Sequence, residues 1–421
     1  MAGELACLRE RLAARVLAAN PIGSERVAAA LRAVPRHLFL PELSPEEAYR
    51  DAAIVTKRDT DGYPISSSSQ PAIMAIMLDQ LGLAPGQRVL EIGAGTGYNA
   101  ALISHIVGEE GQVTSIDIDP ELVGLAREHL ASAGSGAVTV VCSDGAMGYP
   151  ERAPYDRVIA TVGVADLAPA WLEQAAPQAR IVVPLDVRGT QLSVAFERAS
   201  PIGPWTSRSL APCGFMRMRG SLAGPERLVT LAPGLSLLLP DGTIAGEPGP
   251  ADSGVLAALL AGPSVPEPTG VRARPAQVFW ELGLWLAARE PRSFLLNVEG
   301  PDSLLAAAAS RGPGRHSTVG IADGSGIAVL TADRAAGDEA ERPAGEGAEV
   351  LALRAAGFGP RGGQLAADLA AQVRAWDQAG RPGLAGLHVD AYPRTPAGAP
   401  DPGADALVME RPATRFALYH D

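Results

Sequence analysis

The sequence predicts an α/β protein whose first half forms a parallel sheet covered by helices on both faces. Apolar runs of strand length alternate with runs of helix length between residues 88 and 197, which is the pattern of repeated βαβ units. A turn with the spacing G-x-G-x-G, at residues 93–97, joins the first apolar run to a helix. Beyond about residue 211 this alternation stops, and short Gly- and Pro-rich stretches follow. We therefore predict an α/β domain over residues 1–210 and an α+β accessory domain over residues 211–421.

Helical segments open the chain. Two short amphipathic helices are predicted over residues 4–19 and 24–33, because Asn20-Pro21 and Gly23 interrupt the pattern between them. The Pro-punctuated stretch that follows is expected to wrap a surface. A further helix is predicted from Pro71 to about Leu81, since proline suits a first helical position, with Ser69 or Gln70 as the cap before it.

The buried sheet is predicted from apolar runs that lack polar alternation, which is typical of strands covered on both faces. These strands are expected at residues 88–92, 112–117, 137–142, 155–160 and 179–185, with an added edge strand at 190–197. Helices are expected between them at residues 97–107, 120–132 and 166–175.

The second half of the chain is predicted with less regularity. Helices are expected at residues 276–289, where Val278, Leu282, Trp285 and Leu286 share a face, and at 364–378. Strands are expected near residues 384–390, 406–410 and 415–420. The acidic, Ala/Gly/Pro-rich stretch 335–348 predicts a loop or linker.

Composition excludes several classes of partner and site. The net charge of −12 argues against a nucleic acid held by its phosphates. No signal peptide and no apolar run long enough to span a membrane is found, and the cysteines Cys7, Cys142 and Cys213 suggest no disulfide framework. We therefore expect a cytoplasmic protein. The histidines lack metal-ligand spacing, so no metal is expected, and the oligomeric state is left open.

The glycine turn indicates a cofactor site. Glycines at these positions allow a tight turn and a close approach of the backbone to a ligand in a Rossmann-like fold. A nicotinamide site would instead show G-x-G-x-x-G. Glu91 lies two residues before Gly93, and an acidic residue suits a cofactor with a positive charge and an amino group. S-adenosylmethionine (SAM) has both, with S-adenosylhomocysteine as its product, although a glycine turn of a dinucleotide fold remains an alternative.

Carboxylates at the ends of the next strands extend this site. Asp117 ends the second apolar strand, where a carboxylate accepts hydrogen bonds from ribose hydroxyls. Asp144 ends the third, where it would meet the adenine amino group, whereas Asp119 is predicted to cap the helix that opens at Pro120. The complete set expected to bind the cofactor is Gln70, Glu91, Gly93, Ala94, Gly95, Thr96, Gly97, Asn99, Asp117, Ile118, Asp144 and Gly145.

Sequence motifs on both sides of the glycine turn indicate a protein family. The segments "VPRHLFLP", "AYRD", "SSQP", "VLEIGAGTGYNAALI", "SDGAMGYPERAPYDRVIA" and "VVPL" followed by "TQL" occur in the order and spacing of one family. Over residues 30–197 the chain resembles the protein-L-isoaspartate O-methyltransferases. The resemblance implies a SAM-dependent enzyme that methylates a side-chain or isoaspartyl carboxylate in a peptide.

The resemblance also implies an acceptor site. Ser69, in Ser69-Gln70-Pro71, matches the family's residue that would hold the substrate carboxylate, with Ser68 beside it. The residues expected to contact the substrate are Tyr49, Asp51, Ile65 and Ser67. A linker or a plain helix cap is the alternative interpretation of the serine run, and solvent-exposed surface is the default for Arg217 and Arg219.

Two differences from the usual pattern of this family suggest a substrate other than a damaged protein. Ser67 and Ser68 replace the usual Thr/Ser and Ile before the catalytic serine, and about 220 residues follow the sheet. In both respects the chain resembles homologues encoded beside ribosomally made peptides such as lanthipeptides and graspetides. That subgroup implies methylation of an Asp side chain in a modified precursor peptide, leading to succinimide (aspartimide) or isoaspartate, with the accessory domain recognising the peptide. Two alternatives stay open: general isoaspartate repair, and a peptide-binding adaptor without turnover.

Overall fold

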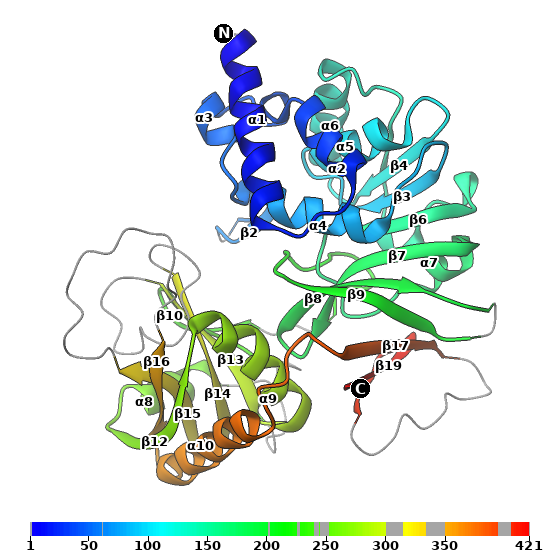
Figure 1. The fold of residues 1–421 in the computed structure, drawn as a ribbon. Helices are drawn as coiled ribbons and strands as arrows, with labels where there is room; N and C mark the ends of the chain where they lie inside the picture. The colour runs from blue at the N-terminus through cyan, green and yellow to red at the C-terminus, as the bar shows by residue number, and fades with distance from the viewer. Residues whose placement is uncertain are drawn as a thin grey trace. The chain divides into compact units, whose positions relative to one another are not determined.

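The computed structural model describes residues 2–60, 62–200, 203–224, 228–239, 244, 252–299, 315–333, 350–394 and 406–420. The chain divides into two compact units, shown as a ribbon in Figure 1. Unit 1 comprises residues 1–186, 191–224 and 388–421, and unit 2 comprises residues 187–190 and 225–387. None of the described helices is both long and apolar enough to cross a bilayer.

Unit 1 is an α/β unit, which confirms the predicted fold class. Its helices are α1 (Ala2–Ala19), α2 (Glu25–Ala33), η1 (Arg36–Phe39), α3 (Pro45–Ala48), α4 (Pro71–Leu81), α5 (Tyr98–Val107), α6 (Pro120–Ser132), η2 (Gly145–Met147), η3 (Pro150–Arg152) and α7 (Pro169–Gln174). Its strands are β1 (Ile54–Arg58), β2 (Pro64–Ser68), β3 (Arg88–Ile92), β4 (Gln112–Asp117), β5 (Thr139–Cys142), β6 (Tyr155–Ala160), β7 (Ala175–Val187), β8 (Thr190–Glu197), β9 (Trp205–Cys213), β17 (Leu387–Pro393), β18 (Leu407–Glu410) and β19 (Thr414–His420).

The large sheet of unit 1 has the strand order β18-β19-β17-β9-β8-β7-β6-β3-β4-β5. Neighbours from β7 to β5 are parallel, whereas β9 pairs antiparallel with β8 and β17. In a parallel sheet all carboxyl ends lie on one edge, where ligands bind in open α/β folds. Hairpin β1–β2 forms a separate antiparallel pair.

The position of the unit boundary differs from the predicted one. Residues 211–224 and 388–421 were assigned from sequence to the accessory domain, but both segments belong to unit 1. The physical reason is strand pairing, because Asp390 and Ala391 of β17 pair with Thr206 and Trp205 of β9. The chain thus leaves unit 1, forms unit 2, and returns to extend the first sheet.

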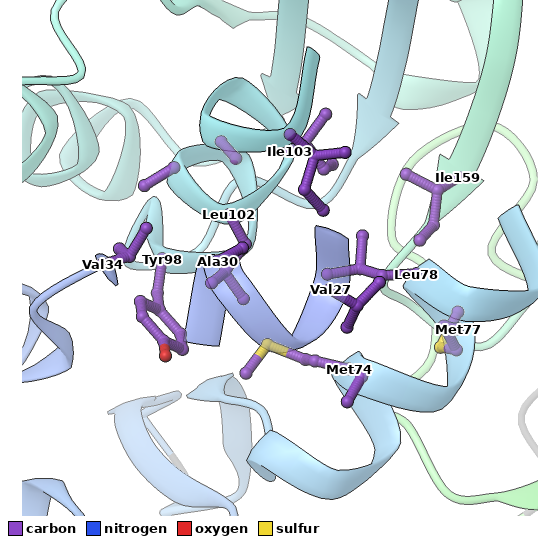
Figure 2. Close-up of a cluster of buried hydrophobic side chains, with 14 of the residues drawn as sticks. Val27, Ala30, Val34, Met74, Met77, Leu78, Tyr98, Leu102, Ile103 and Ile159 are labelled. Atoms are coloured by element: carbon purple, nitrogen blue, oxygen red, sulfur yellow. The ribbon is translucent and has the colours of Figure 1, made fainter. Parts of the chain in front are cut away.

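Apolar helix faces form the core of unit 1 around α2, α4 and α5. Figure 2 shows Val27 and Ala30 of α2, Met74 and Leu78 of α4, and Leu102 of α5 gathered in one cluster. Each side chain in this set is at most 3% exposed. Burial of a Val, Leu or Met side chain contributes about 1.5–3 kcal/mol, so this cluster fixes α4 and α5 beside the sheet edge.

Helix ends in unit 1 follow their capping residues. Asp119 accepts hydrogen bonds from the backbone N–H groups of Glu121 and Leu122, which confirms its prediction as the cap of α6. The N-cap of α4 is Gln70, as expected, but its side chain makes no capping bond. Asp51, distant in sequence, instead accepts from Ala72 N at 2.9 Å.

Unit 2 contains an antiparallel sheet with the order β10-β11-β13-β14-β15-β16-β12. Its strands are β10 (Leu228–Ala232), β11 (Leu235–Leu238), β12 (Ser264–Ala273), β13 (Ser293–Glu299), β14 (Arg315–Asp323), β15 (Gly326–Asp333) and β16 (Leu351–Phe358), and its helices are α8 (Ser253–Leu260), the π-helical η4 (Gln277–Leu282), α9 (Gly283–Arg289) and α10 (Gly362–Gln378). Leu365, Leu369, Val373 and Trp376 of α10 are buried in its core. The predicted loop at 335–348 lies outside the described residues.

Candidate active site

One pocket opens at the carboxyl ends of β3 and β4. Four segments and several single residues line it. The lining consists of Ile65–Ser69, Met74, Ile92–Thr96, Tyr98, Asn99, Ile116–Ile118, Leu122, Gly145, Thr161, Val162 and Phe215–Arg219. The predicted acceptor serines and most of the predicted cofactor residues therefore border the same space.

The glycine turn brings backbone to the pocket wall. Gly93, Gly95 and Gly97 have φ values of 101°, 51° and 87°, a region that favours glycine. The N–H groups of Gly93 and Ala94 donate to the Ile116 carbonyl at 2.8 and 3.0 Å, which ties the turn to β4. Helix α5 begins directly after it, at Tyr98.

Asp117 connects this turn to the end of β4. Its Oδ2 accepts from Gly95 N at 3.0 Å and its Oδ1 from Asp119 N at 3.1 Å. The residue is 8% exposed and borders the pocket together with its exposed neighbour Ile118. Each carboxylate oxygen has further acceptor capacity, so Asp117 can bind the turn and a ligand together.

Glu91 lies behind the pocket lining, fully buried. It accepts hydrogen bonds from Asn99 Nδ2 at 2.8 Å and from the Ser115 hydroxyl. Burial raises the pKa of Glu91 to about 7, although these two hydrogen bonds oppose the shift. In this structure Glu91 positions Asn99, and Asn99 is the residue of the pair that lines the pocket.

The raised pKa of Glu91 predicts a pH dependence of stability. The folded protein binds this proton more tightly than the unfolded chain between pH 4.5 and about 7. As the pH rises from 4.5 to about 7, the contribution of this group to the free energy of unfolding should therefore decrease by about 3 kcal/mol. Urea unfolding of the wild type and Glu91→Gln at pH 5 and pH 8 measures this, because the decline should be smaller in the variant. Parallel pH profiles of the two proteins would refute it.

Asp144 lies outside the pocket lining, while its neighbour Gly145 borders it. The Asp144 carboxylate accepts from Ala146 N at 3.0 Å and from Ser221 N at 2.8 Å. Burial alone would raise the pKa of Asp144, but these hydrogen bonds outweigh it and lower the pKa. The structure therefore places Asp144 as an anchor of the segment that ends at Ser221.

The serine run belongs to strand β2 and its exit, and not to a linker. Ser68 pairs with Ile54, and Ser66 with Lys57. The Ser66 hydroxyl accepts from Thr56 Oγ1 at 3.1 Å. Ser68 is 3% exposed, and its hydroxyl has no hydrogen-bond partner among the described residues.

The comparisons with known proteins agree with these motifs. The family model described as Protein-L-isoaspartate(D-aspartate) O-methyltransferase matches residues 9–215. A protein-L-isoaspartate O-methyltransferase of Methanopyrus kandleri is 38% identical over 213 residues, covering 50% of this chain and 91% of that protein. This chain belongs to the protein-L-isoaspartate O-methyltransferase family. The family uses SAM, in agreement with the cofactor predicted from sequence.

Other similar proteins align with different shares of this chain. A protein-L-isoaspartate O-methyltransferase of Methanococcoides burtonii is 42% identical over 177 residues, 42% of this chain and 82% of its own. A solved protein-L-isoaspartate O-methyltransferase aligns over 91% of this chain and 96% of its own, with 23% identity and a TM-score of 0.48. A Plasmodium falciparum structure described as a complex with S-adenosyl-L-homocysteine aligns over 50% of this chain and 98% of its own, with 15% identity and a TM-score of 0.44.

Behind the serine run of this family member lies Arg36, which the sequence interpretation did not single out. The guanidinium is fully buried and donates to the carbonyls of Ala48 at 2.9 Å and Ser69 at 3.1 Å. It also stacks over the Tyr98 ring, 4.9 Å from the centroid. Removal from water lowers the pKa of Arg36. The buried Arg36 side chain thus holds the backbone of Ser69 in place by a hydrogen bond.

Tyr49, Asp51 and Gln70 lie outside the pocket lining. Asp51 accepts from Gln70 Nε2 at 3.1 Å as well as from the first turn of α4. Tyr49 shares a 2.9 Å hydrogen bond with His37 Nδ1. Asp51 therefore holds the segment that follows the serine run, whereas Ile65 and Ser67 border the pocket directly.

A cover segment, Phe215–Arg219, forms the remaining wall of the pocket in this family member. Met218 N donates to the Gly163 carbonyl at 2.9 Å, and Gly163 N to the Met216 carbonyl at 2.8 Å. Arg219 therefore lies near acidic groups, with Asp117 at 3.9 Å and Asp119 at 3.7 Å. Arg217 and Arg219, for which solvent-exposed surface was the default, both line the pocket, while 39% of the Arg219 side chain stays exposed. The Met-Arg alternation of the cover segment is a strand-like pattern that could have signalled this.

Proposed function

We propose that this protein is a SAM-dependent O-methyltransferase acting on an isoaspartyl carboxylate in a protein or peptide. One observation carries the proposal: the serines of β2 and the glycine turn line the same pocket. The carbonyl of Ser67 lies 3.6 Å from where a Cβ on Gly95 would be. The acceptor side and the cofactor side of the site are therefore adjacent.

The pocket fits SAM at two places. The Asp117 carboxylate can accept hydrogen bonds from ribose hydroxyls at the edge of β4. The glycine turn leaves room for the amino-acid portion against the start of α5, because it carries no bulky side chain. When bound, SAM supplies a methyl group activated by a positively charged sulfonium.

The residues of this chain have mainly to align the acceptor. A carboxylate is already ionised at neutral pH, so no general base is required. One carboxylate oxygen forms a bond to the methyl carbon while the bond from sulfur to that carbon breaks, which leaves a neutral thioether. The hydroxyl of Ser69 would donate to the carboxylate and hold it in line, and Ser68 offers a second buried hydroxyl.

Ser69→Ala should reduce kcat/KM for methyl transfer about tenfold, the value of one hydrogen bond to a charged group, and leave SAM affinity unchanged. Transfer of a labelled methyl group to an isoaspartyl peptide measures the first quantity, and calorimetric SAM titration the second. Ser132→Ala is the control, because the exposed Ser132 hydroxyl donates to the Glu128 carbonyl and lies outside the pocket lining. Equal loss of SAM binding in Ser69→Ala would rule out the acceptor role.

A second candidate is peptide tailoring, in which an Asp side chain of a modified precursor peptide is methylated. The observation that favours it is unit 2, whose residues 225–387 lie outside residues 9–215, the range that the family model matches. In that reaction the backbone nitrogen of the following residue attacks the ester, methanol leaves, and a succinimide forms. Hydrolysis of the succinimide would give isoaspartate.

Paired peptides distinguish the two candidates. Two synthetic peptides of identical sequence, one with Asp and one with isoaspartate, are compared with a precursor peptide encoded beside the gene. Methylation of the isoaspartyl peptide alone supports the first candidate. A precursor peptide lighter by one water after incubation with SAM supports tailoring, and no methyl transfer to any of the three would overturn both.

A further inference from the structure

Lys57 is the only lysine in the chain. It joins the serine hairpin, which consists of β1 and β2, to the cofactor edge, which is the carboxyl end of β4 with Asp117 and Asp119. It lies on β1, while its partners are Asp119, in the turn between β4 and α6, and Glu121, in the first turn of α6. Its Nζ is 2.9 and 2.8 Å from the two carboxylate oxygens of Asp119 and 2.6 Å from Glu121 Oε2. The serine hairpin is thereby held to the turn and the start of α6 by three charge-assisted hydrogen bonds.

Asp119 links Lys57 to the cofactor side of the pocket. It caps α6, and its own N–H donates to Asp117 Oδ1 at 3.1 Å. Asp117 in turn receives the Gly95 N–H at 3.0 Å. A continuous series of hydrogen bonds therefore runs from Lys57 through both carboxylates to the glycine turn.

The other end of the connection lies on the acceptor side. Lys57 pairs with Ser66 across the hairpin, and Val55 pairs with Ser67. Thr56 is thus the extra residue of a β-bulge, a feature that redirects side chains. Thr56 bonds the Ser66 hydroxyl, while Lys57 reaches Asp119. The two neighbours fix one strand to both sides of the pocket.

We propose that Lys57 is a positioning residue that sets the distance between the acceptor serines and the cofactor edge. This role rests on the proposed methyl transfer, in which the carboxylate must lie in line with the methyl group. A small misplacement of reacting groups lowers the rate strongly. Lys57 itself does not line the pocket, so it acts through the hairpin and not on the substrate.

Lys57→Met should lower kcat about tenfold, as expected for slight misalignment, while SAM affinity and melting temperature stay close to wild type. Arg58→Met is the matched control. It removes the same charge from the next residue of β1, whose guanidinium donates, among the residues that the structure describes, to the Gly62 carbonyl of the same hairpin. Lys57→Arg should restore part of kcat, because a cation again reaches Asp119. Equal effects of Lys57→Met and Arg58→Met, or a parallel loss of SAM affinity, would overturn the proposal.

A second measurement is independent of turnover. In Arg58→Lys the chain carries two adjacent lysines, and their rates of reductive methylation are compared by peptide mapping. Lys57 should react several-fold more slowly than the lysine at position 58, because three oxygens hold its Nζ. Equal rates would show that the connection does not form in solution. If the wild type transfers no methyl group yet Lys57 is protected, the proposed function fails while the connection stands.

Discussion

Gly93→Ala should lower the free energy of unfolding by roughly 4 kcal/mol, the sum of backbone strain and overpacking. Gly93 has φ = 101°, and a Cβ there would lie 2.7 Å from Thr161 Oγ1 and 3.1 Å from Val162 Cγ1. Thr161 cannot easily move away, because its hydroxyl is bonded to the Ile92 and Gly93 carbonyls. Urea unfolding measures the loss, and SAM titration shows whether the displaced turn still binds.

Gly134→Ala separates the two contributions. Gly134 also has a positive φ, 75°, but a Cβ there would meet nothing within 4 Å, so only the strain remains. Adding Thr161→Ala to Gly93→Ala removes the close atom, and this second change should cost less than it does in the wild type. The assignment of a steric conflict fails if Gly93→Ala and Gly134→Ala lose equal stability.

Local signals were sufficient for much of unit 1. The predicted strand at 88–92, the helix at 120–132 and its Asp119 cap were all confirmed, because periodicity and capping act within a few residues. The sequence analysis predicted no strand over the serine run, because its pairing depends on Ile54–Arg58, a partner that no local pattern of Ser66–Ser69 reveals. Serine is not among the residues enriched in strands, so tertiary contacts decided the outcome.

Long-range contacts account for what the sequence could not place. Asp144 looked free at a strand end, but Ser221, 77 residues later, donates to it. The segment 388–421 is joined to unit 1 by long-range contacts, among them the pairing of β17 with β9 and the hydrogen bond from Ala413 N to Asp166. The same limit applies to Arg36, because the carbonyl that it binds belongs to Ser69, far from it in sequence. Motifs thus located the site, whereas its second layer of supporting contacts required the fold.

Asp117→Ala should weaken SAM binding roughly 100-fold, because a ribose held by two charge-assisted hydrogen bonds loses about 3 kcal/mol. The change also leaves the N–H groups of Gly95 and Asp119 without the oxygens they bond. The turn and the cap of α6 should both loosen, so kcat should fall as well. Calorimetric titration with SAM measures the affinity, and turnover at saturating SAM measures the fall in kcat.

Asp156→Ala is the control that tests whether position in the sheet matters. Asp156 also accepts a backbone N–H, that of Arg88 at 2.8 Å, but at the amino end of β3. Its loss removes the same charge and the same kind of bond, yet it should leave SAM affinity unchanged, since ligands of open α/β sheets bind at the carboxyl edge. Comparable losses in the two variants would mean that Asp117 acts only through stability. A loss confined to Asp117→Ala would assign the ribose edge of the site to this carboxylate.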